Sequence, residues 1–119
     1  MKIWVPFKAA VDVLRDLPDV ECVVYDGTEP LPDGVDEVEV WVPPLIPTER
    51  IPELLARMSR LRLLQTVTAG VDAYRPHLPE GVVLCNARGV HDAGTAEWAV
   101  GAMIAVLREF PGFTVAQRE

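Results

Sequence analysis

The sequence predicts an α/β fold with a parallel sheet of five strands. Short, nearly continuous apolar runs alternate along the chain with amphipathic helical patterns. This alternation is typical of a parallel sheet whose two faces are both covered by helices. At 119 residues the chain forms one domain at most, and it is long enough to bury a real core.

The N-terminal half supplies three of the predicted strands and two helices. Apolar runs of strand character lie at residues 2–7 (KIWVPF), 22–25 (CVVY) and 38–42 (VEVWV). Apolar positions at helical spacing predict a helix over residues 10–17, which Pro18 ends. A single apolar stripe along residues 51–61 predicts the second helix.

The C-terminal half completes the sheet and ends in a long helix. Strands are expected over residues 61–67 and 82–86, with a short helix between them. Asp92 is a candidate N-cap for a helix over residues 93–108. The expected order is therefore β-α-β-β-α-β-(short helix)-β-α.

Composition and charge exclude several classes of partner. The net charge of −7 argues against a nucleic-acid or anionic-membrane surface, because both need basic patches. The many acidic residues between positions 16 and 39 are interpreted as a solvated rim rather than a cation site. No secretory signal and no apolar run of about 20 residues is visible. Together with Cys22 and Cys85, which lie in apolar runs, this predicts a cytoplasmic protein in a reducing compartment.

In parallel sheets, ligands bind beyond the carboxyl ends of the strands. The candidate ligand-binding loops are therefore those that follow strands, at residues 43–47, 68–72 and 86–92. In the second loop, TAGVD, a glycine allows a sharp turn that exposes consecutive N–H groups, and such a turn binds carboxylates or phosphates. The alternative is a plain turn into a helix that Asp72 caps. The residues alone leave both interpretations open.

No catalytic or metal site can be assembled from this chain. His91, in the loop RGVHD, is a possible general base, but no orienting partner is visible and a structural or exposed histidine is the simpler interpretation. The chain has no G-x-G-x-x-G and no phosphate-binding P-loop motif. Its only serine, Ser59, lies in a predicted helix, and its two Cys and two His residues lack metal-ligand spacing.

The predicted helix over residues 93–108 is apolar on nearly every face. A helix of this kind is buried on all sides. It is either the central helix of this domain or is packed between this domain and another. We favour the second interpretation because the helix is the last predicted element.

Residues 64–108 resemble the D-isomer-specific 2-hydroxyacid dehydrogenases, in particular glyoxylate/hydroxypyruvate reductase and phosphoglycerate dehydrogenase-like members. The matching pieces are LQTVTAGVD and LPEGVVLCNARGVHDAGTAEWAVGAMIAVLR. The combination of AGVD, a Gly-Val-His-Asp loop and T-A-E in a long apolar helix is far more specific than any one piece. Before Leu61 the resemblance is only architectural.

This resemblance implies a flavodoxin-like substrate domain that is interrupted, in the full-length parent, by an NAD(P)-binding domain. Residues 1–92 would be the N-terminal part of the substrate domain, residues 93–109 the interdomain helix, and residues 110–119 the start of a linker to the absent domain. The parent would reduce a small 2-keto acid to a 2-hydroxy acid with NAD or NADP. The family's catalytic arginine, glutamate and histidine have no counterpart here, so we expect this chain to be inactive alone and to bind no cofactor.

The resemblance also assigns candidate site residues. The backbone N–H groups of Ala69, Gly70 and Val71 would hold the substrate carboxylate, and Pro44 and Leu45 would line the substrate pocket. A further residue, Thr95, would face the nicotinamide end of the cofactor. The resemblance favours the anion-binding interpretation of the turn over the plain one.

Two other functions are compatible with the same topology. The first is a free-standing binding or dimerisation module, in which the apolar helix over residues 93–109 pairs two copies; this can also hold for a fragment of a dehydrogenase. The second is a receiver-like signalling domain. Asp26 would suit it, but Phe7 and Lys8 follow the first strand where acidic residues are needed, and Arg88 is the only basic residue after the last.

Overall fold

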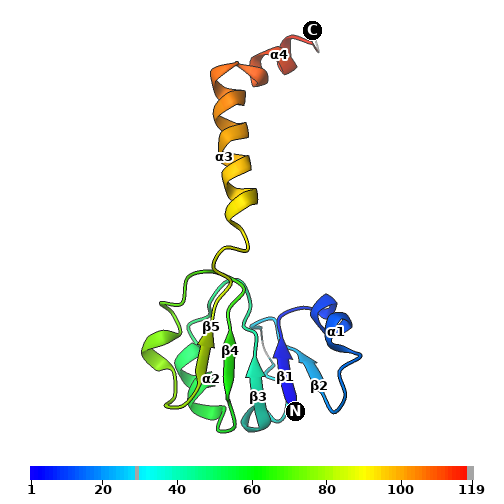
Figure 1. Ribbon diagram of the computed structural model, residues 1–119, viewed down its shortest axis with the longest axis vertical. Coiled ribbons are helices and arrows are strands. Elements are labelled where there is room, and N and C mark those ends of the chain that lie inside the picture. The colour runs from blue at the N-terminus through cyan, green and yellow to red at the C-terminus, as the bar shows by residue number, and fades with distance from the viewer. Residues whose placement is uncertain (29, 118–119) are drawn as a thin grey trace. The chain divides into compact units, whose positions relative to one another are not determined.

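The computed structural model describes residues 1–28 and 30–117, and its centre is a five-stranded, all-parallel sheet (Figure 1). The strands pair in the order β2-β1-β3-β4-β5. This order is the flavodoxin-like one, so the predicted fold class is confirmed. The strands are β1 (Lys2–Val5), β2 (Glu21–Val24), β3 (Val38–Trp41), β4 (Leu63–Gln65) and β5 (Val83–Cys85).

The helices are α1 (Lys8–Leu14), α2 (Ile51–Arg57), α3 (Asp92–Leu107) and α4 (Phe110–Ala116), with the 3₁₀ turns η1 (Val35–Glu37) and η2 (Arg75–His77). Helices α1, α2 and α3 follow the predicted order with changes at their ends, whereas α4 was not predicted. The prediction that Asp92 caps the long helix is wrong: Asp92 is its first residue, His91 precedes it, and no side chain caps it. β1 ends before Pro6, which has no N–H group to donate to the ladder. β2 has the predicted length but begins one residue earlier, and β3, β4 and β5 are shorter than predicted.

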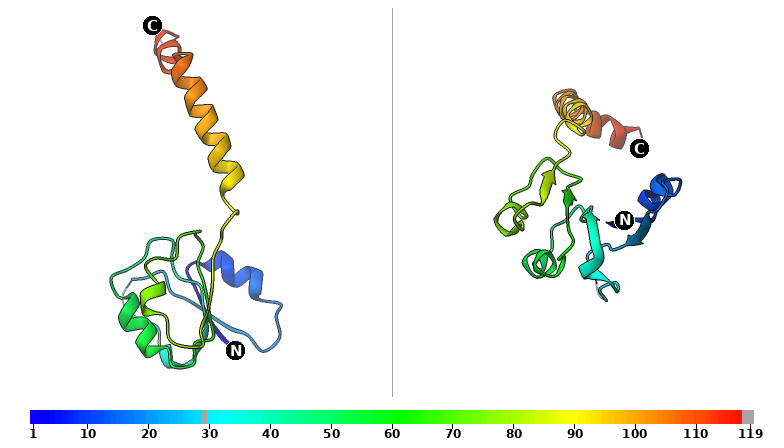
Figure 2. Two further views of the ribbon diagram at one scale, coloured as in Figure 1. Left: turned by 60° about the vertical axis from the view of Figure 1, so that its left-hand side comes forward. Right: turned by 60° about the horizontal axis from the view of Figure 1, so that its bottom comes forward.

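The two faces of the sheet carry different helices. Connections between parallel strands are right-handed, so reversing the direction of travel across the sheet moves the connecting helix to the opposite face. The chain moves one way from β1 to β2 and the other way from β3 through β5. As a result, α1 and α2 lie on opposite sides of the sheet (Figure 2, left).

The core lies between the sheet and α2. Trp4, Trp41 and Leu64, from three neighbouring strands, are fully buried there against Leu54 and Leu55 of α2. These large side chains hold together the strands whose carboxyl ends form the candidate site.

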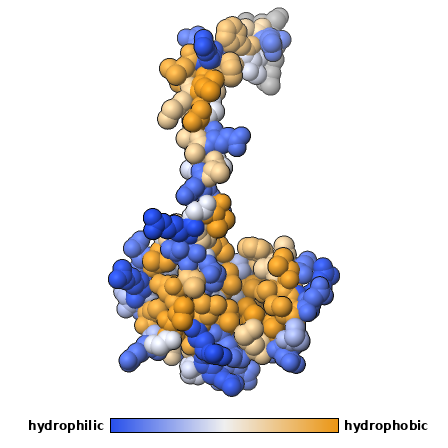
Figure 3. Space-filling model, in the orientation of Figure 1, coloured by the Kyte–Doolittle hydropathy of each residue, from blue (hydrophilic) through white to orange (hydrophobic). Residues whose placement is uncertain are grey.

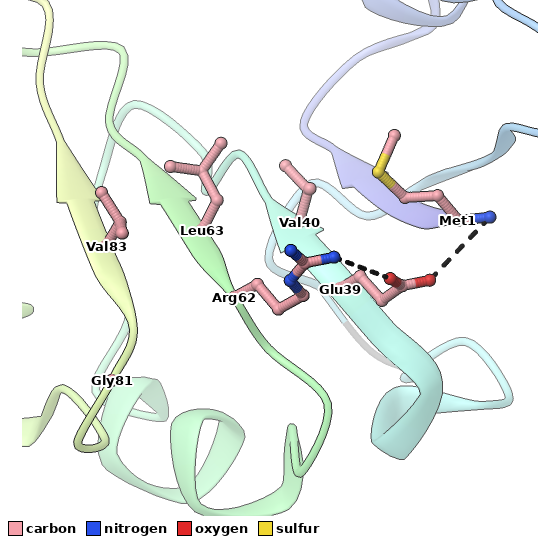
Figure 4. A pocket seen from close by; sticks show the side chains of 7 residues that line it. All are labelled: Met1, Glu39, Val40, Arg62, Leu63, Gly81 and Val83. Atoms are coloured by element: carbon pink, nitrogen blue, oxygen red, sulfur yellow. Dashed lines mark ion pairs between the residues drawn. The ribbon is translucent and has the colours of Figure 1, made fainter.

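Part of the other sheet face is open within residues 1–87. Val40, Leu63 and Val83 occupy one register row across β3, β4 and β5, and Figure 4 shows them pointing to the same side. They line a hollow of about 450 Å³, and the Val83 side chain is 57% exposed. The Glu39 carboxylate at its edge lies 3.8 Å from the N-terminal ammonium and 4.0 Å from Arg62. Figure 3 shows apolar side chains gathered on this unit's surface.

The chain divides into two compact units, residues 1–87 and residues 88–119. The second unit contains α3 and α4, and none of its described residues is buried. Residues 110–116, predicted as the start of a linker, are helical, whereas residues 118–119 lie outside the described part of the chain. In the described residues no single helix suffices to cross a membrane; α3 and α4 reach that length only as a pair bent by 58°.

Candidate functional site

A buried threonine, Thr66, fixes the start of the loop that follows β4. Thr66 follows β4 directly and is 2% exposed. Its Oγ1 donates to the Thr68 carbonyl at 2.7 Å and lies 3.4 Å from the Cys85 carbonyl of β5. A buried hydroxyl needs partners of this kind, and here they tie the start of the loop to the neighbouring strand.

Every carbonyl of the turn from Thr68 to Val71 accepts a hydrogen bond from the chain. The Thr68 carbonyl accepts from the Ala87 N–H at 3.0 Å, and the Ala69 carbonyl accepts from Asn86 Nδ2 at 3.0 Å. The Gly70 carbonyl accepts from Thr68 Oγ1 at 3.1 Å. The Val71 carbonyl accepts from the N–H groups of Tyr74 and Arg75, each at 3.0 Å.

The N–H groups of the same turn, unlike its carbonyls, are not hydrogen-bonded within the described residues. Those of Ala69, Gly70 and Val71 have no acceptor among residues 1–28 and 30–117, and Ala69 and Gly70 are exposed. Consecutive unsatisfied N–H donors in a turn carry partial positive charge and form an anion site. With its acceptors used internally and its donors open, the turn is suited to bind a carboxylate or phosphate.

A hollow of about 320 Å³ lies beside this turn, and we call it the Gly70 hollow. Leu45 and Pro47, from the loop after β3, form one part of its wall, and Thr68, Gly70 and Asp72 form another. Tyr74 closes it from the core side, where its ring meets Trp41 edge-on with centroids 6.2 Å apart. Burial raises the pKa of Tyr74, so its hydroxyl is neutral at physiological pH.

The structure brings together some of the predicted site residues. Leu45 and Gly70 line the same hollow, and Ala69 belongs to the same turn. Val71 faces a neighbouring hollow that it shares with Asn86. Pro44 is not part of the lining of the Gly70 hollow; its Cγ lies 3.1 Å from the position that a Cβ on Gly27 would take.

The fifth position, Thr95, belongs to the second unit. It lies in the first turns of α3, where its N–H bonds to the His91 carbonyl at 3.0 Å. It lines a separate hollow with His91 and Trp98. Within the described part of the chain, no three His, Cys, Asp or Glu side chains gather as a metal site.

Two residues that hold the turn were missed by the sequence analysis, namely Thr66 and Asn86. Each is the first residue after an apolar strand, at the edge where ligands bind. Their polar side chains at that position were the available signal. The hydrogen bond from Asn86 to the turn depends on the pairing of β4 with β5, which no local pattern specifies. The hydroxyl of Thr66 bonds the turn locally, at the Thr68 carbonyl.

No protein-family model and no curated protein sequence matches the chain. Solved structures do. A D-isomer specific 2-hydroxyacid dehydrogenase family protein from Aeromonas salmonicida subsp. salmonicida A449 matches 98% of this chain and 38% of its own, with a TM-score of 0.76 and 20% identity. The D-lactate dehydrogenase from Aquifex aeolicus, complexed with NAD and lactic acid, matches 88% of this chain and 33% of its own, with a TM-score of 0.64 and 19% identity.

Phosphoglycerate dehydrogenase from Lactobacillus plantarum matches with a TM-score of 0.51 and 22% identity, over 100% of this chain and 39% of its own. At these identities the likeness is one of fold. The chain spans less than two-fifths of the length of the structures that it matches.

Replacing Thr66 tests whether its hydroxyl holds the turn. We expect Thr66→Val to lower the free energy of unfolding by about 1–2 kcal/mol, because the hydrogen bond that the buried hydroxyl donates to the Thr68 carbonyl is lost. It should also speed hydrogen exchange of the Ala87 N–H, which bonds the Thr68 carbonyl, and move the amide resonances of residues 68–71. Thr66→Ser, which keeps the hydroxyl, should leave those resonances near their original positions. Unchanged turn resonances in Thr66→Val would contradict the assigned role.

Proposed function

We propose that this chain is the N-terminal portion of the substrate domain of an NAD(P)-dependent D-2-hydroxyacid dehydrogenase, which interconverts 2-keto and 2-hydroxy acids. The observation that carries the proposal is the turn at residues 68–71, whose carbonyls are bonded and whose N–H groups are open. It lies at the sheet edge where this fold binds ligands. The likeness in fold to three dehydrogenases supports the proposal.

Each candidate residue has a role consistent with its position. The N–H groups of Ala69, Gly70 and Val71 hold the substrate carboxylate, and Leu45 contributes an apolar wall. Pro44 precedes Leu45 and restricts the path of the same loop. Thr95, on α3, is proposed to face the nicotinamide end of the cofactor in the full-length parent.

The cofactor, NAD or NADP, would supply or accept the hydride, and the groups that move protons would come from the domain that binds it. We assign no catalytic residue to this chain. The cofactor domain is also proposed as the partner that covers α3. The NAD and lactic acid named for the Aquifex enzyme support this assignment for the parent.

Two uncovered apolar surfaces support the idea that the chain is part of a larger protein. Both faces of a parallel sheet are normally covered, yet Val40, Leu63 and Val83 line an open hollow within the first unit. In the second unit, Trp98, Met103 and Leu107 are among the exposed apolar residues of α3. We propose a cytoplasmic location, with which the free Cys22 and Cys85 are compatible.

The chain alone should bind its acid weakly. Two charge-assisted hydrogen bonds contribute about 3–6 kcal/mol in total. Association costs about 4 kcal/mol or more in lost freedom of motion. The net affinity should therefore be about millimolar or weaker.

Binding can be measured by NMR with the 119-residue chain. We expect D-lactate at roughly 10–100 mM to move the amide resonances of residues 69–71, consistent with millimolar affinity. Gly70→Ala should keep the fold, because no atom lies within 4 Å of the added Cβ, but should weaken binding severalfold by filling space beside the hollow. Gly101→Ala, on α3 and equally free of contacts, is the matched control. If no acid moves these resonances, the carboxylate-binding role is refuted.

An activity assay tests the proposal that the catalytic groups belong to the cofactor domain and not to this chain. Hydride transfer needs a cofactor held against the substrate, so we expect no oxidation of NADH or NADPH with glyoxylate or hydroxypyruvate above the rate without protein. Absorbance at the nicotinamide band reports the reaction. A measurable kcat for the purified chain would contradict the claim that the catalytic groups lie elsewhere.

Self-association is a second candidate function for the same chain. The described part of the second unit buries no residue, and its exposed apolar side chains continue from α3 into α4 at Phe110 and Phe113. Large exposed apolar patches mark interaction surfaces. We propose that, without the cofactor domain, α3 pairs two copies as a homodimer.

A charge placed on α3 should separate such a dimer. Val106 is 71% exposed, so Val106→Asp should leave the fold intact while shifting sedimentation from dimer towards monomer, with a dissociation constant raised at least tenfold. Val13→Asp, at an 80% exposed position on α1, is the matched control and should not alter the association. A monomer at high concentration in the unmodified chain would exclude the dimer.

A further inference from the structure

The loop that follows β3 forms one wall of the Gly70 hollow, and the tip of that loop is held by few contacts. Leu45 and Pro47, which line the hollow, are exposed, and so is Ile46 between them. None of these three residues makes a hydrogen bond among residues 1–28 and 30–117. The position of the tip therefore depends on the residues at its two ends.

Pro44 and Thr48, on either side of the tip, pack against Gly27 in the loop after β2. A Cβ on Gly27 would lie 3.0 Å from Thr48 Cγ2 and 3.1 Å from Pro44 Cγ, closer than Cβ atoms normally come to their neighbours. Gly27 also has a positive φ of 96°, which glycine adopts readily and other residues rarely adopt. The two loops can fit this closely because residue 27 has no side chain.

The same two loops meet again at Tyr25 and Arg50. Tyr25 is buried and packs against Trp4 of β1, with ring centroids 5.1 Å apart. The Glu53 carboxylate, and to a smaller extent the Tyr25 hydroxyl, raise the pKa of the Arg50 guanidinium, so Tyr25 lies beside the end of the loop that follows β3. The loop after β2 thus supports that loop at both ends of its exposed tip.

We infer that Gly27 is a positioning residue for the proposed substrate site, because through Pro44 and Thr48 it sets the position of the apolar wall of the Gly70 hollow. A side chain at position 27 would displace those two residues by a few tenths of an ångström. The tip that joins them would move with them. Gly27 itself is not part of the lining of the hollow, so it acts only through this contact between loops.

Such a displacement would affect one part of the proposed site and spare the other. The turn that carries the N–H groups of residues 69–71 accepts hydrogen bonds from Asn86 and Ala87, beyond β5, and should keep its position. The wall acts on the side chain of the acid, because an apolar group that leaves water against Leu45 gains affinity. The inference rests on the proposed function, since it takes the turn as the site of the carboxylate. It adds a residue outside the hollow that controls how well the side chain of the acid fits.

The test is an NMR titration of the 119-residue chain with glycolate, which has no side chain, and with D-2-hydroxy-4-methylpentanoate, which has an apolar one. The amide resonances of residues 69–71 report the binding of both acids. We expect the unmodified chain to bind the larger acid at least fivefold more tightly than glycolate. Gly27→Ala should lower that ratio at least twofold, because the larger acid loses its fit against the wall while glycolate keeps its affinity.

Three further variants separate displacement of the wall from strain in the backbone. Gly81→Ala adds a Cβ to a glycine with a similar φ of 83° and no atom within 4 Å, so it should leave the ratio unchanged. Thr48→Ser, added to Gly27→Ala, removes the methyl group nearest the new Cβ and should restore part of the ratio. Pro44→Ala removes the ring atom that meets position 27, should lower the ratio as Gly27→Ala does, and tests the inference if Gly27→Ala does not fold.

The outcomes separate the two claims. Suppose that both acids bind, but that the unmodified chain does not distinguish them, that Gly27→Ala and Pro44→Ala leave the ratio unchanged, that Gly81→Ala lowers it equally, or that Thr48→Ser restores none of it. Any one of these results overturns the positioning role of Gly27 and leaves the carboxylate site in place. If neither acid moves the resonances of residues 69–71, the proposed function fails and this inference fails with it.

Discussion

The pairing of β4 with β5 is the constraint on which the candidate site depends. It places Asn86 and Ala87 next to the loop that leaves β4, so that they donate to the carbonyls of Ala69 and Thr68. Donors of the loop itself bond the carbonyls of Gly70 and Val71. Once the carbonyls are bonded inward, the N–H groups are left as the accessible polar groups. The anion binding that we propose for the turn would thus depend on backbone N–H groups and on no charged side chain.

The pairing of β4 with β5 also explains why the site would gain stability from chain that covers the open face of the sheet. A three-residue strand at a sheet edge gives little stability by itself, and β5 has an exposed valine on one face. The core under α2 supports the other face through Leu64 and Leu84. Chain that covered the open face would stiffen the strand that positions the turn, which links the uncovered surface to the geometry of the site.

Sequence patterns predicted the elements well where apolar periodicity is strong, as in α2 and α3, and less well at their ends. Asp92 was expected to cap α3 but is its first residue, and His91 occupies the position before it. Pro44 and Leu45 are adjacent in sequence, yet only Leu45 lines the Gly70 hollow. Which side a loop residue faces depends on packing, here of Pro44 beside Gly27, and not on its neighbours in sequence.

By itself the sequence determined the fold class, the order of its elements and the turn at Thr68–Asp72 as a candidate ligand site, because apolar period and glycine placement are local signals. Tertiary structure alone decided that Thr66 and Asn86 hold that turn, that its N–H groups are left open, and that Asp72 shares a hollow with Leu45. Two of these relations join residues far apart in the chain, namely Ala69 with Asn86, 17 positions apart, and Leu45 with Asp72, 27 positions apart. They arise only when parallel strands bring their carboxyl ends to one edge of the sheet.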